Sequence, residues 1–110
     1  IDGACHITGG GITDNLPRIL PKELGMDFKN SNWFLPEIFK WFKEQGDMSF
    51  DETIKVFNCG IGMVIICKPN KKNIIIKKLK KLNEPFFFLG KVVENKGKID
   101  TNFLKKKWEY

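Results

Sequence analysis

The sequence predicts an α+β fold, layered as in α/β proteins, in which a mixed β-sheet of about four strands is covered by helices. Two observations predict this class. Segments with helical periodicity alternate with short apolar or β-branched runs, and glycines, prolines and asparagines separate the segments. A length of 110 residues with 42% hydrophobic residues allows one modest core, so we expect a single domain over residues 1–110.

The N-terminal part is expected to form a glycine-rich loop over residues 3–11, followed by a helix whose apolar residues recur near helical spacing. Thr13 or Asp14 can cap this helix. Pro17 then falls in its first turn, where a missing N–H costs little. A short strand over residues 26–31 is expected to follow.

Two helices are predicted in the middle of the chain. The first begins at Pro36, has apolar residues on one side and charged residues on the other, and ends at Gly46 as a left-handed cap. Ser49, followed three residues later by Glu52, matches a capping box. This spacing predicts a short helix over residues 50–57.

The remaining elements alternate strand, helix and strands. Residues 62–67 are continuous and β-branched, which predicts a strand buried on both faces. Residues 70–82 predict a lysine-rich helix with its apolar residues, including Leu82, toward the core. Residues 86–93 and 98–103 predict two strands joined as a hairpin.

The charge of the chain is strongly basic but does not favour nucleic acid. The net charge is +6, and Arg18 is the one arginine among 19 basic residues. Proteins that read nucleic acid commonly use arginine forks and stacked aromatics, whereas the dense run Lys77–Lys81 contains neither. Its apolar runs are also far shorter than the roughly 20 residues that cross a bilayer. We therefore expect no nucleic acid and no membrane as partners.

The cysteines and the histidine argue against a structural metal site. Cys5, Cys59 and Cys67 are odd in number and form no Cys-x-x-Cys pair, and His6 is the single histidine. A cytoplasmic, reducing setting is therefore expected. The start at Ile1 lacks both an initiator methionine and a secretory pattern, so we expect the chain to begin inside a longer protein.

A first candidate site lies where the sequence runs through three consecutive glycines into a helix. Glycines let the backbone approach an anion closely, and N–H groups at the start of a helix favour phosphate. The phosphate-binding candidates here are Thr8, Gly9, Gly10 and Gly11. The spacing matches neither a P-loop nor a dinucleotide motif, so a simple tight loop is an equal alternative.

Two charged or titratable side chains accompany this loop. Arg18 could direct its guanidinium at the same anion, or could instead form a surface ion pair with Asp14. His6 is the catalytic candidate, because its side chain can carry a proton near neutral pH. A lone histidine with a purely structural role is the alternative.

A second candidate site follows the helix predicted over residues 50–57. Asn58, Gly60 and Gly62 lie at its junction with a predicted strand, where the backbone can meet a ligand or simply pack closely. Cys59 has no neighbouring base and is rejected as a nucleophile. We expect the two glycine segments to converge, so that their amides hold the anionic groups of a nucleotide.

Taken together, the two segments resemble the C-terminal part of the aminoimidazole ribonucleotide (AIR) synthetase family, also called phosphoribosylformylglycinamidine cyclo-ligases. The matching strings are His6–Gly11, Asn15–Pro21, Pro36–Phe39 and Phe57–Met63. The resemblance covers residues 4 to about 68, and beyond them only the order of elements is similar.

The resemblance implies an enzyme of purine biosynthesis that uses ATP and magnesium to convert formylglycinamidine ribonucleotide to aminoimidazole ribonucleotide. It also implies a cytoplasmic homodimer with an N-terminal ATP-binding domain, which is absent from this chain, as are the acidic metal ligands. The segments His6–Gly11 and Asn58–Gly62 would line the active site. By itself, the chain is expected to be inactive.

Two alternatives stay open. One is another ATP-dependent synthase of the same superfamily, of the formylglycinamidine ribonucleotide synthase or selenophosphate synthetase type. The other is a non-catalytic module whose basic helix binds nucleic acid or an acidic partner.

Overall fold

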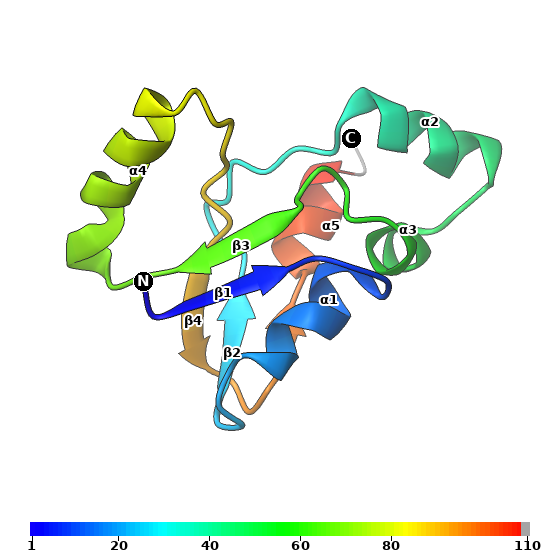
Figure 1. Cartoon of the computed structure of the whole chain (residues 1–110). Helices are drawn as coiled ribbons and strands as arrows, with labels where there is room; N and C mark the ends of the chain where they lie inside the picture. Colours follow the sequence, from blue (N-terminus) through cyan, green and yellow to red (C-terminus); the bar gives the residue numbers. More distant parts are fainter. Residues whose placement is uncertain (109–110) are drawn as a thin grey trace.

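The structure is a computed structural model that describes residues 1–108, which contain five α-helices and five strands (Figure 1). The strands are β1 (Gly3–His6), β2 (Leu24–Asp27), β3 (Met63–Ile66), β4 (Lys91–Glu94) and β5 (Ile99–Asp100). The α-helices are α1 (Gly11–Asn15), α2 (Glu37–Gln45), α3 (Phe50–Val56), α4 (Lys72–Lys81) and α5 (Asn102–Trp108). Two 3-10 turns, η1 (Leu16–Arg18) and η2 (Pro69–Lys71), complete the described elements.

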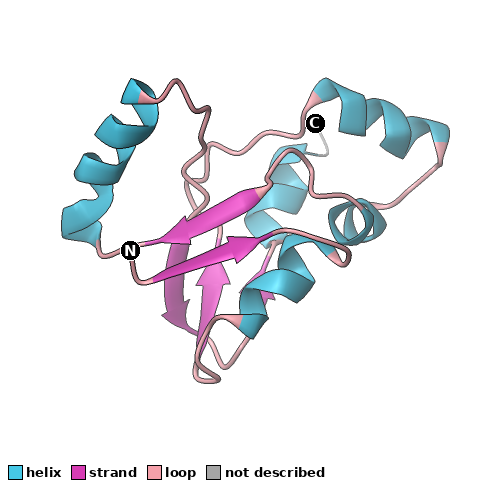
Figure 2. Ribbon diagram, viewed as in Figure 1, coloured by secondary structure: helices cyan, strands magenta, loops and turns pink. Residues whose placement is uncertain are grey.

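The strands form two sheets, as Figure 2 shows. β1 and β3 pair antiparallel in a two-stranded sheet. In the three-stranded sheet, β2 lies in the middle, antiparallel to β4 and parallel to β5. The α+β class is therefore confirmed, but the single mixed sheet expected from the sequence is divided into two.

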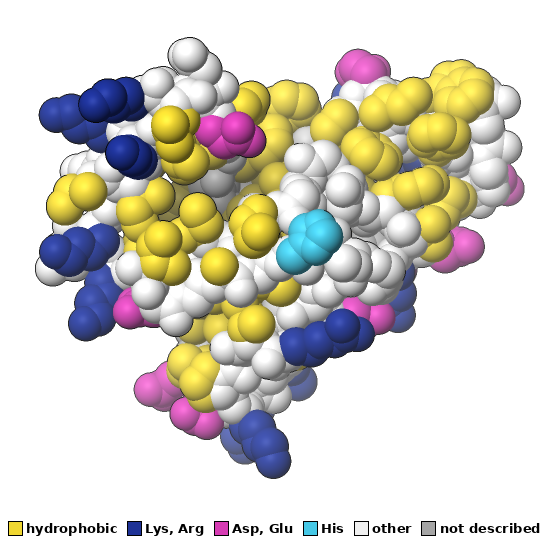
Figure 3. Space-filling model, in the orientation of Figure 1, with side chains coloured by type: hydrophobic (Ala, Val, Ile, Leu, Met, Phe, Trp, Pro, Cys, Tyr) yellow, Lys and Arg dark blue, Asp and Glu magenta, His cyan; other side chains and the backbone are white. Residues whose placement is uncertain are grey.

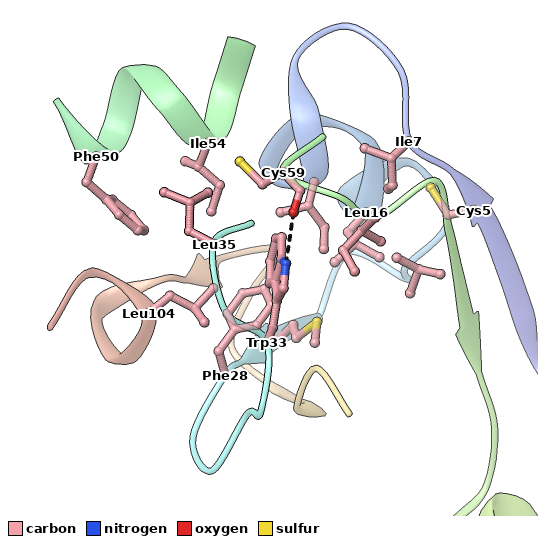
Figure 4. Packing of buried hydrophobic residues seen from close by; sticks show 14 residues of the cluster. Cys5, Ile7, Leu16, Phe28, Trp33, Leu35, Phe50, Ile54, Cys59 and Leu104 are labelled. Atoms are coloured by element: carbon pink, nitrogen blue, oxygen red, sulfur yellow. Dashed lines mark hydrogen bonds between the residues drawn. The ribbon is translucent and has the colours of Figure 1, made fainter. Parts of the chain in front are cut away.

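The core lies between these sheets and is centred on Trp33 (Figure 4). Trp33 is fully buried in the loop between β2 and α2, and its indole Nε1–H donates a 3.1 Å hydrogen bond to the carbonyl oxygen of Cys59. The Trp108 ring meets it edge-on, with ring centroids 4.9 Å apart. One aromatic side chain thus connects α5 to the turn that precedes β3.

The N-terminal elements differ from the prediction. Residues 3–6 form β1 and not part of a loop. α1 begins after Gly10 without a side-chain cap, so the expected caps Thr13 and Asp14 are wrong. The helix tightens at Pro17 into the 3-10 turn η1, where the proline occupies an early position that needs no N–H donor. Of the strand expected at 26–31, only residues 26 and 27 belong to a strand, because β2 begins at Leu24 and ends at Asp27.

Helices α2 and α3 confirm the predictions for the middle of the chain. The capping box of α3 is present: the Glu52 N–H donates to Ser49 Oγ at 3.1 Å, and the Ser49 N–H donates to Glu52 Oε1 at 3.2 Å. The expected left-handed cap at Gly46 is wrong, since its φ is −88°, and the following residue, Asp47, takes the positive φ of 49° instead.

Burial along β3 and α4 is lower than the sequence predicts. In β3 only Val64 is buried, so the expectation of a strand buried on both faces is wrong. Helix α4 is confirmed, but none of its residues is buried, and Leu82 just beyond it is 63% exposed. Among residues 1–108, no helix is long and apolar enough to span a bilayer.

The predicted C-terminal hairpin is wrong because β2 lies between its two strands. Gly25 of β2 makes this possible: a Cβ atom there would collide with the carbonyl of Lys98, so glycine lets the returning chain approach. Gly97 N–H then donates to the carbonyl of Leu24 at 2.8 Å, which fixes the turn against β2. Of the second predicted strand, residues 98–103, only Ile99–Asp100 forms a strand (β5), and helix α5 begins at Asn102.

Candidate functional site

The two glycine segments lie side by side, as the sequence predicted. In the β1–β3 sheet His6 is opposite Met63, and one residue further the Ile7 N–H donates to the carbonyl of Gly62 at 2.9 Å. On the other side of the first segment, Gly11 packs directly against the backbone carbonyl of Ile54 in α3. The antiparallel pairing of β1 and β3 therefore brings both segments to the same end of this sheet.

The first segment forms a tight turn before α1. The Gly11 N–H donates to the carbonyl of Thr8 at 3.1 Å, and Gly10 and Gly11 have φ values of 92° and 67°. Such values favour glycine, because a Cβ atom would crowd the neighbouring backbone. The turn therefore requires glycine at its last two positions, whereas Gly9 has an ordinary φ.

Asn15 organises this turn, and the sequence reasoning did not single it out. Its side-chain amide is 4% exposed and donates to the carbonyls of Gly11, Thr8 and Gly9 at 2.6, 3.3 and 3.4 Å. Its Oδ1 accepts the Thr8 hydroxyl at 3.0 Å. The available signal in the sequence was an asparagine at a position that helical periodicity assigns to the apolar face, four residues after the last glycine.

The hydrogen bonds to Asn15 leave backbone N–H groups of the turn directed outward. Three carbonyl groups of the turn point toward the buried Asn15 amide, so the N–H groups on the opposite side of the same peptide units point away from it. Within residues 1–108, the N–H groups of Gly9 and Gly10 have no hydrogen-bond partner. Successive free N–H groups in a turn can form a concavity that binds anions, although here the side-chain carboxylate of Asp14 packs against Gly10. The Thr8 hydroxyl donates its hydrogen bond to Asn15, so toward a ligand it can act only as an acceptor.

The second segment is a type I′ turn. The Ile61 N–H donates to the carbonyl of Asn58 at 3.0 Å, with φ values of 52° at Cys59 and 93° at Gly60. The Asn58 side-chain oxygen accepts the Gly60 N–H at 2.9 Å. This turn is further fixed by the hydrogen bond from Trp33 to the Cys59 carbonyl.

The surface that the turns share is open and accessible. A Cβ atom on Gly9 or Gly62 would meet no heavy atom within 4 Å. Thr8, Asn58 and His6 are exposed, and the His6 side chain is visible beside the hydrophobic surface of Figure 3. The two turns thus form part of a surface to which a ligand or another domain has access.

The two side chains expected to support catalysis and phosphate binding are placed differently. His6 lies at the end of β1, next to the first turn. Arg18 ends η1, about 10 Å along the helical axis from Gly11. The alternative ion pair between Arg18 and Asp14 is also absent, because the described residues contain one salt bridge, Lys40–Glu37 at 3.3 Å. Arg18 instead lies close enough to Cys5 to affect its thiol.

Neither thiol near the turns is reactive at neutral pH. Burial raises the pKa of the Cys59 thiol to about 12, and its Sγ lies 3.7 Å from the carbonyl oxygens of Thr53 and Phe57. Burial also raises the pKa of the Cys5 thiol, and the positive charge of Arg18 partly opposes this. A buried, protonated thiol is a poor nucleophile, in accord with the rejection of Cys59 as catalytic.

The pKa of Cys59 predicts a loss of stability at high pH. Only the unfolded thiol ionises between its ordinary pKa of 9.0 and the folded value of about 12. The unfolded state then binds fewer protons, so the free energy of unfolding falls by about 1.4 kcal/mol per pH unit in that window. Urea unfolding at several pH values should show a shallower decline for Cys59→Ala than for the parent chain. Parallel declines would contradict the assignment.

The described residues contain no cluster of three or more His, Cys, Asp or Glu side chains that could hold a metal ion.

The comparisons with known proteins identify the family of this chain. Residues 1–101 match the family model described as AIR synthase related protein, C-terminal domain. The bifunctional purine biosynthetic protein purD of Dictyostelium discoideum is 43% identical over 96 residues, which cover 87% of this chain and 12% of that protein.

Two further relatives also match most of this chain. The phosphoribosylformylglycinamidine cyclo-ligase of Bacillus pumilus is 39% identical over 97 residues, covering 88% of this chain and 28% of the relative. The human trifunctional purine biosynthetic protein adenosine-3 is 36% identical over 88 residues, covering 80% of this chain and 9% of the relative. The chain thus spans less than a third of each of these relatives, and by its match over residues 1–101 it belongs to the AIR synthase related C-terminal domain family.

Proposed function

We propose that this chain is the C-terminal part of an ATP-dependent phosphoribosylformylglycinamidine cyclo-ligase, in which its two glycine turns bind anionic groups of the nucleotide or substrate. The observation that carries this proposal is the pair of free N–H groups at Gly9 and Gly10, beside the second turn at Asn58–Ile61. Names of relatives 36–43% identical support the reaction class.

The proposed reaction needs donors where negative charge gathers. The formyl oxygen of formylglycinamidine ribonucleotide attacks the terminal phosphorus of ATP, which releases ADP. The amidine nitrogen then attacks the activated carbon, and the phosphorylated oxygen leaves as phosphate while the ring closes. Each step places charge on phosphoryl oxygens, which N–H groups fixed by Asn15 can stabilise without reorganisation.

The other candidate residues have supporting roles in this proposal. Gly11 and Gly60 give the two turns their shape, and Thr8 is held by Asn15. His6 is the proposed proton carrier, because it is exposed at the same end of the sheet. Asn58 can still offer its amide N–H groups to a ligand. Arg18 is assigned no direct contact with the first turn, since it lies at the far end of η1.

The remaining parts of the proposal concern the whole protein. The matched relatives are more than three times longer than the segment they share with this chain, which supports additional polypeptide in the complete protein. In this proposal that polypeptide includes an N-terminal ATP-binding domain. Magnesium would neutralise phosphate charge, with its carboxylate ligands in that domain. A cytoplasmic homodimer is the proposed state of the complete enzyme.

The test replaces two glycines that the fold itself does not require. A chimera, called here the joined protein, is made in which this chain replaces the matching segment of the Bacillus pumilus cyclo-ligase. Gly9→Val and Gly62→Val place a side chain in open space, so they should leave stability nearly unchanged. If ligand approaches these positions, each should lower kcat/KM by about a hundredfold or more, equivalent to about 2.7 kcal/mol.

The matched control is Lys78→Val on the exposed side of α4, which should keep normal turnover. The 110-residue chain by itself should not cyclise the substrate. Normal kcat/KM in both glycine variants would show that the turns do not contact the reacting molecules. A correctly folded joined protein without any ATP-dependent cyclisation would refute the proposed activity itself.

A further inference from the structure

The side chain of Asp14 lies against the first glycine turn. Asp14 is in the first turn of α1, and a Cβ atom built on Gly10 would collide with its carboxylate. Glycine at position 10 therefore allows the carboxylate to pack directly on the backbone of the turn. The N–H groups of Gly9 and Gly10 have no hydrogen-bond partner within residues 1–108. A negative charge thus lies beside the donors that the proposed function assigns to phosphoryl oxygens.

The Asp14 carboxylate is not neutralised by a cation of the described chain. Asp14 is exposed, and the one salt bridge among residues 1–108 is on α2. Arg18, four residues later, forms no pair with it. The side-chain hydrogen bonds of the turn end at Asn15 or at backbone carbonyls and do not involve Asp14. The carboxylate is therefore available to a ligand.

The position of this carboxylate restricts the kind of ligand that the turn can bind. Two negative charges a few ångströms apart repel each other, and the repulsion is stronger where water is excluded. The Asp14 carboxylate therefore opposes the binding of a bare phosphate at Gly10. The arrangement instead favours a ligand that carries an anionic oxygen and a cationic group close together.

The substrate of the proposed reaction has this pattern of charge. Its amidine group is strongly basic and carries a positive charge at neutral pH. An amidine nitrogen attacks the carbon that bears the phosphorylated oxygen, and reacting atoms approach within about 3–3.5 Å before a bond forms. The amidine and the phosphoryl oxygens must therefore lie next to each other in the site, as Asp14 and the N–H groups of the turn do.

We propose that Asp14 binds the amidine group of the substrate, while the N–H groups of Gly9 and Gly10 bind the phosphoryl oxygens beside it. Hydrogen bonds from a charged nitrogen to a carboxylate are about twice as strong as neutral ones, and two nitrogens on one carbon can bind both carboxylate oxygens. Asp14 is then the residue that distinguishes an amidine from the corresponding neutral amide. This inference rests on the proposed function, to which it adds a determinant of substrate choice.

The same contact assists the ring-closing step. The attacking amidine nitrogen gives its electron pair to the activated carbon, the bond from that carbon to the phosphorylated oxygen breaks, and phosphate leaves. Positive charge then collects on the second amidine nitrogen, which becomes the amino group of the product. Asp14 accepts a hydrogen bond from this second nitrogen and stabilises the charge. The attacking nitrogen loses its proton to His6, the proposed proton carrier, which is exposed at the same end of the sheet.

The test compares how tightly the joined protein binds an amidine and an amide. The two probes are formylglycinamidine ribonucleotide and its analogue with a neutral amide in place of the amidine, and binding is measured by calorimetry without ATP. The parent chain should bind the amidine at least about tenfold more tightly, equivalent to about 1.4 kcal/mol. Asp14→Asn keeps the shape of the side chain but removes its charge, so it should abolish this preference. Asp14→Glu keeps the charge and should retain part of the preference.

The matched control is Asp51→Asn. Asp51 is also an exposed aspartate in the first turn of a short helix, α3, so the substitution removes the same charge from an equivalent position. It should leave the preference for the amidine unchanged. The inference would be overturned by a preference that survives in Asp14→Asn, or by a parent chain that binds both probes equally. A preference that survives together with a higher magnesium requirement would identify Asp14 as a metal ligand instead.

Binding does not depend on turnover, which separates this inference from the proposed function. In an active joined protein, Asp14→Asn should also lower kcat/KM by about tenfold or more, and Asp51→Asn by less than about twofold. An active joined protein without the amidine preference would refute only the role of Asp14. An inactive one that shows the preference, and loses it in Asp14→Asn, would refute only the proposed activity. The absence of both would refute both.

Discussion

Trp33→Ala is expected to lower the free energy of unfolding by about 4 kcal/mol, because removing a buried tryptophan costs about 3–5 kcal/mol. Trp33 is fully buried and contacts both Trp108 of α5 and Phe28, with ring centroids 4.9 and 6.1 Å away. Small domains have only about 5–15 kcal/mol of stability in total. The variant should therefore unfold at a much lower urea concentration, measured by far-UV circular dichroism.

Trp33→Phe separates the hydrogen bond from the packing. It keeps an aromatic ring but removes the donor to the Cys59 carbonyl, so it should cost about 1–3 kcal/mol. This loss should be accompanied by greater mobility of the turn at Cys59–Gly60, seen as faster amide exchange. A loss for Trp33→Ala of less than about 1 kcal/mol would mean that the ring is not central to the core.

The sequence predicted local structure best where a side chain acts on its own backbone. The capping box at Ser49 and Glu52 involves groups three residues apart, and the helix it predicts is present. The helix beginning near Pro36 is confirmed for the same reason, since its periodicity is local. Strand partners depend on contacts between distant residues. The insertion of β2 between β4 and β5 rests on Gly25 meeting Lys98, a contact that no local pattern shows.

The burial of β3 and α4 shows a second limit of sequence reasoning. A continuous β-branched run predicts two buried faces, yet Met63 and Ile65 are exposed. The apolar pattern reports that both faces can be buried, but not which molecule covers them.

For the candidate site, the sequence predicted the two turns and their approach but not the roles of individual glycines. The sequence does not distinguish one glycine of the turn from another. The structure does, because Gly11 packs against a backbone carbonyl of α3 whereas Gly9 faces open space. Asn15 was missed because its three acceptors are carbonyls of the turn, and the sequence does not show where these point.

Gly11→Ala should be among the most damaging single changes in the chain. Gly11 has a φ of 67°, which costs a non-glycine residue about 1–2 kcal/mol. In addition, the new Cβ would collide with the carbonyl oxygen of Ile54, which belongs to a helical backbone and cannot rotate away. Separating α1 from α3 adds the cost of lost packing, so we expect a total loss of about 3 kcal/mol or more in urea unfolding.

Gly9→Ala is the control that separates the effect of the position in the turn from the effect of adding a Cβ atom. It makes the same substitution two residues earlier in the same turn, where a Cβ meets nothing within 4 Å, so stability should change by less than about 0.5 kcal/mol. Equal losses in the two variants would show that the turn tolerates no side chain anywhere, and that Gly11 is not specifically packed against α3. A large difference would show that α3 fixes the last glycine of the turn while the first stays free to meet a ligand.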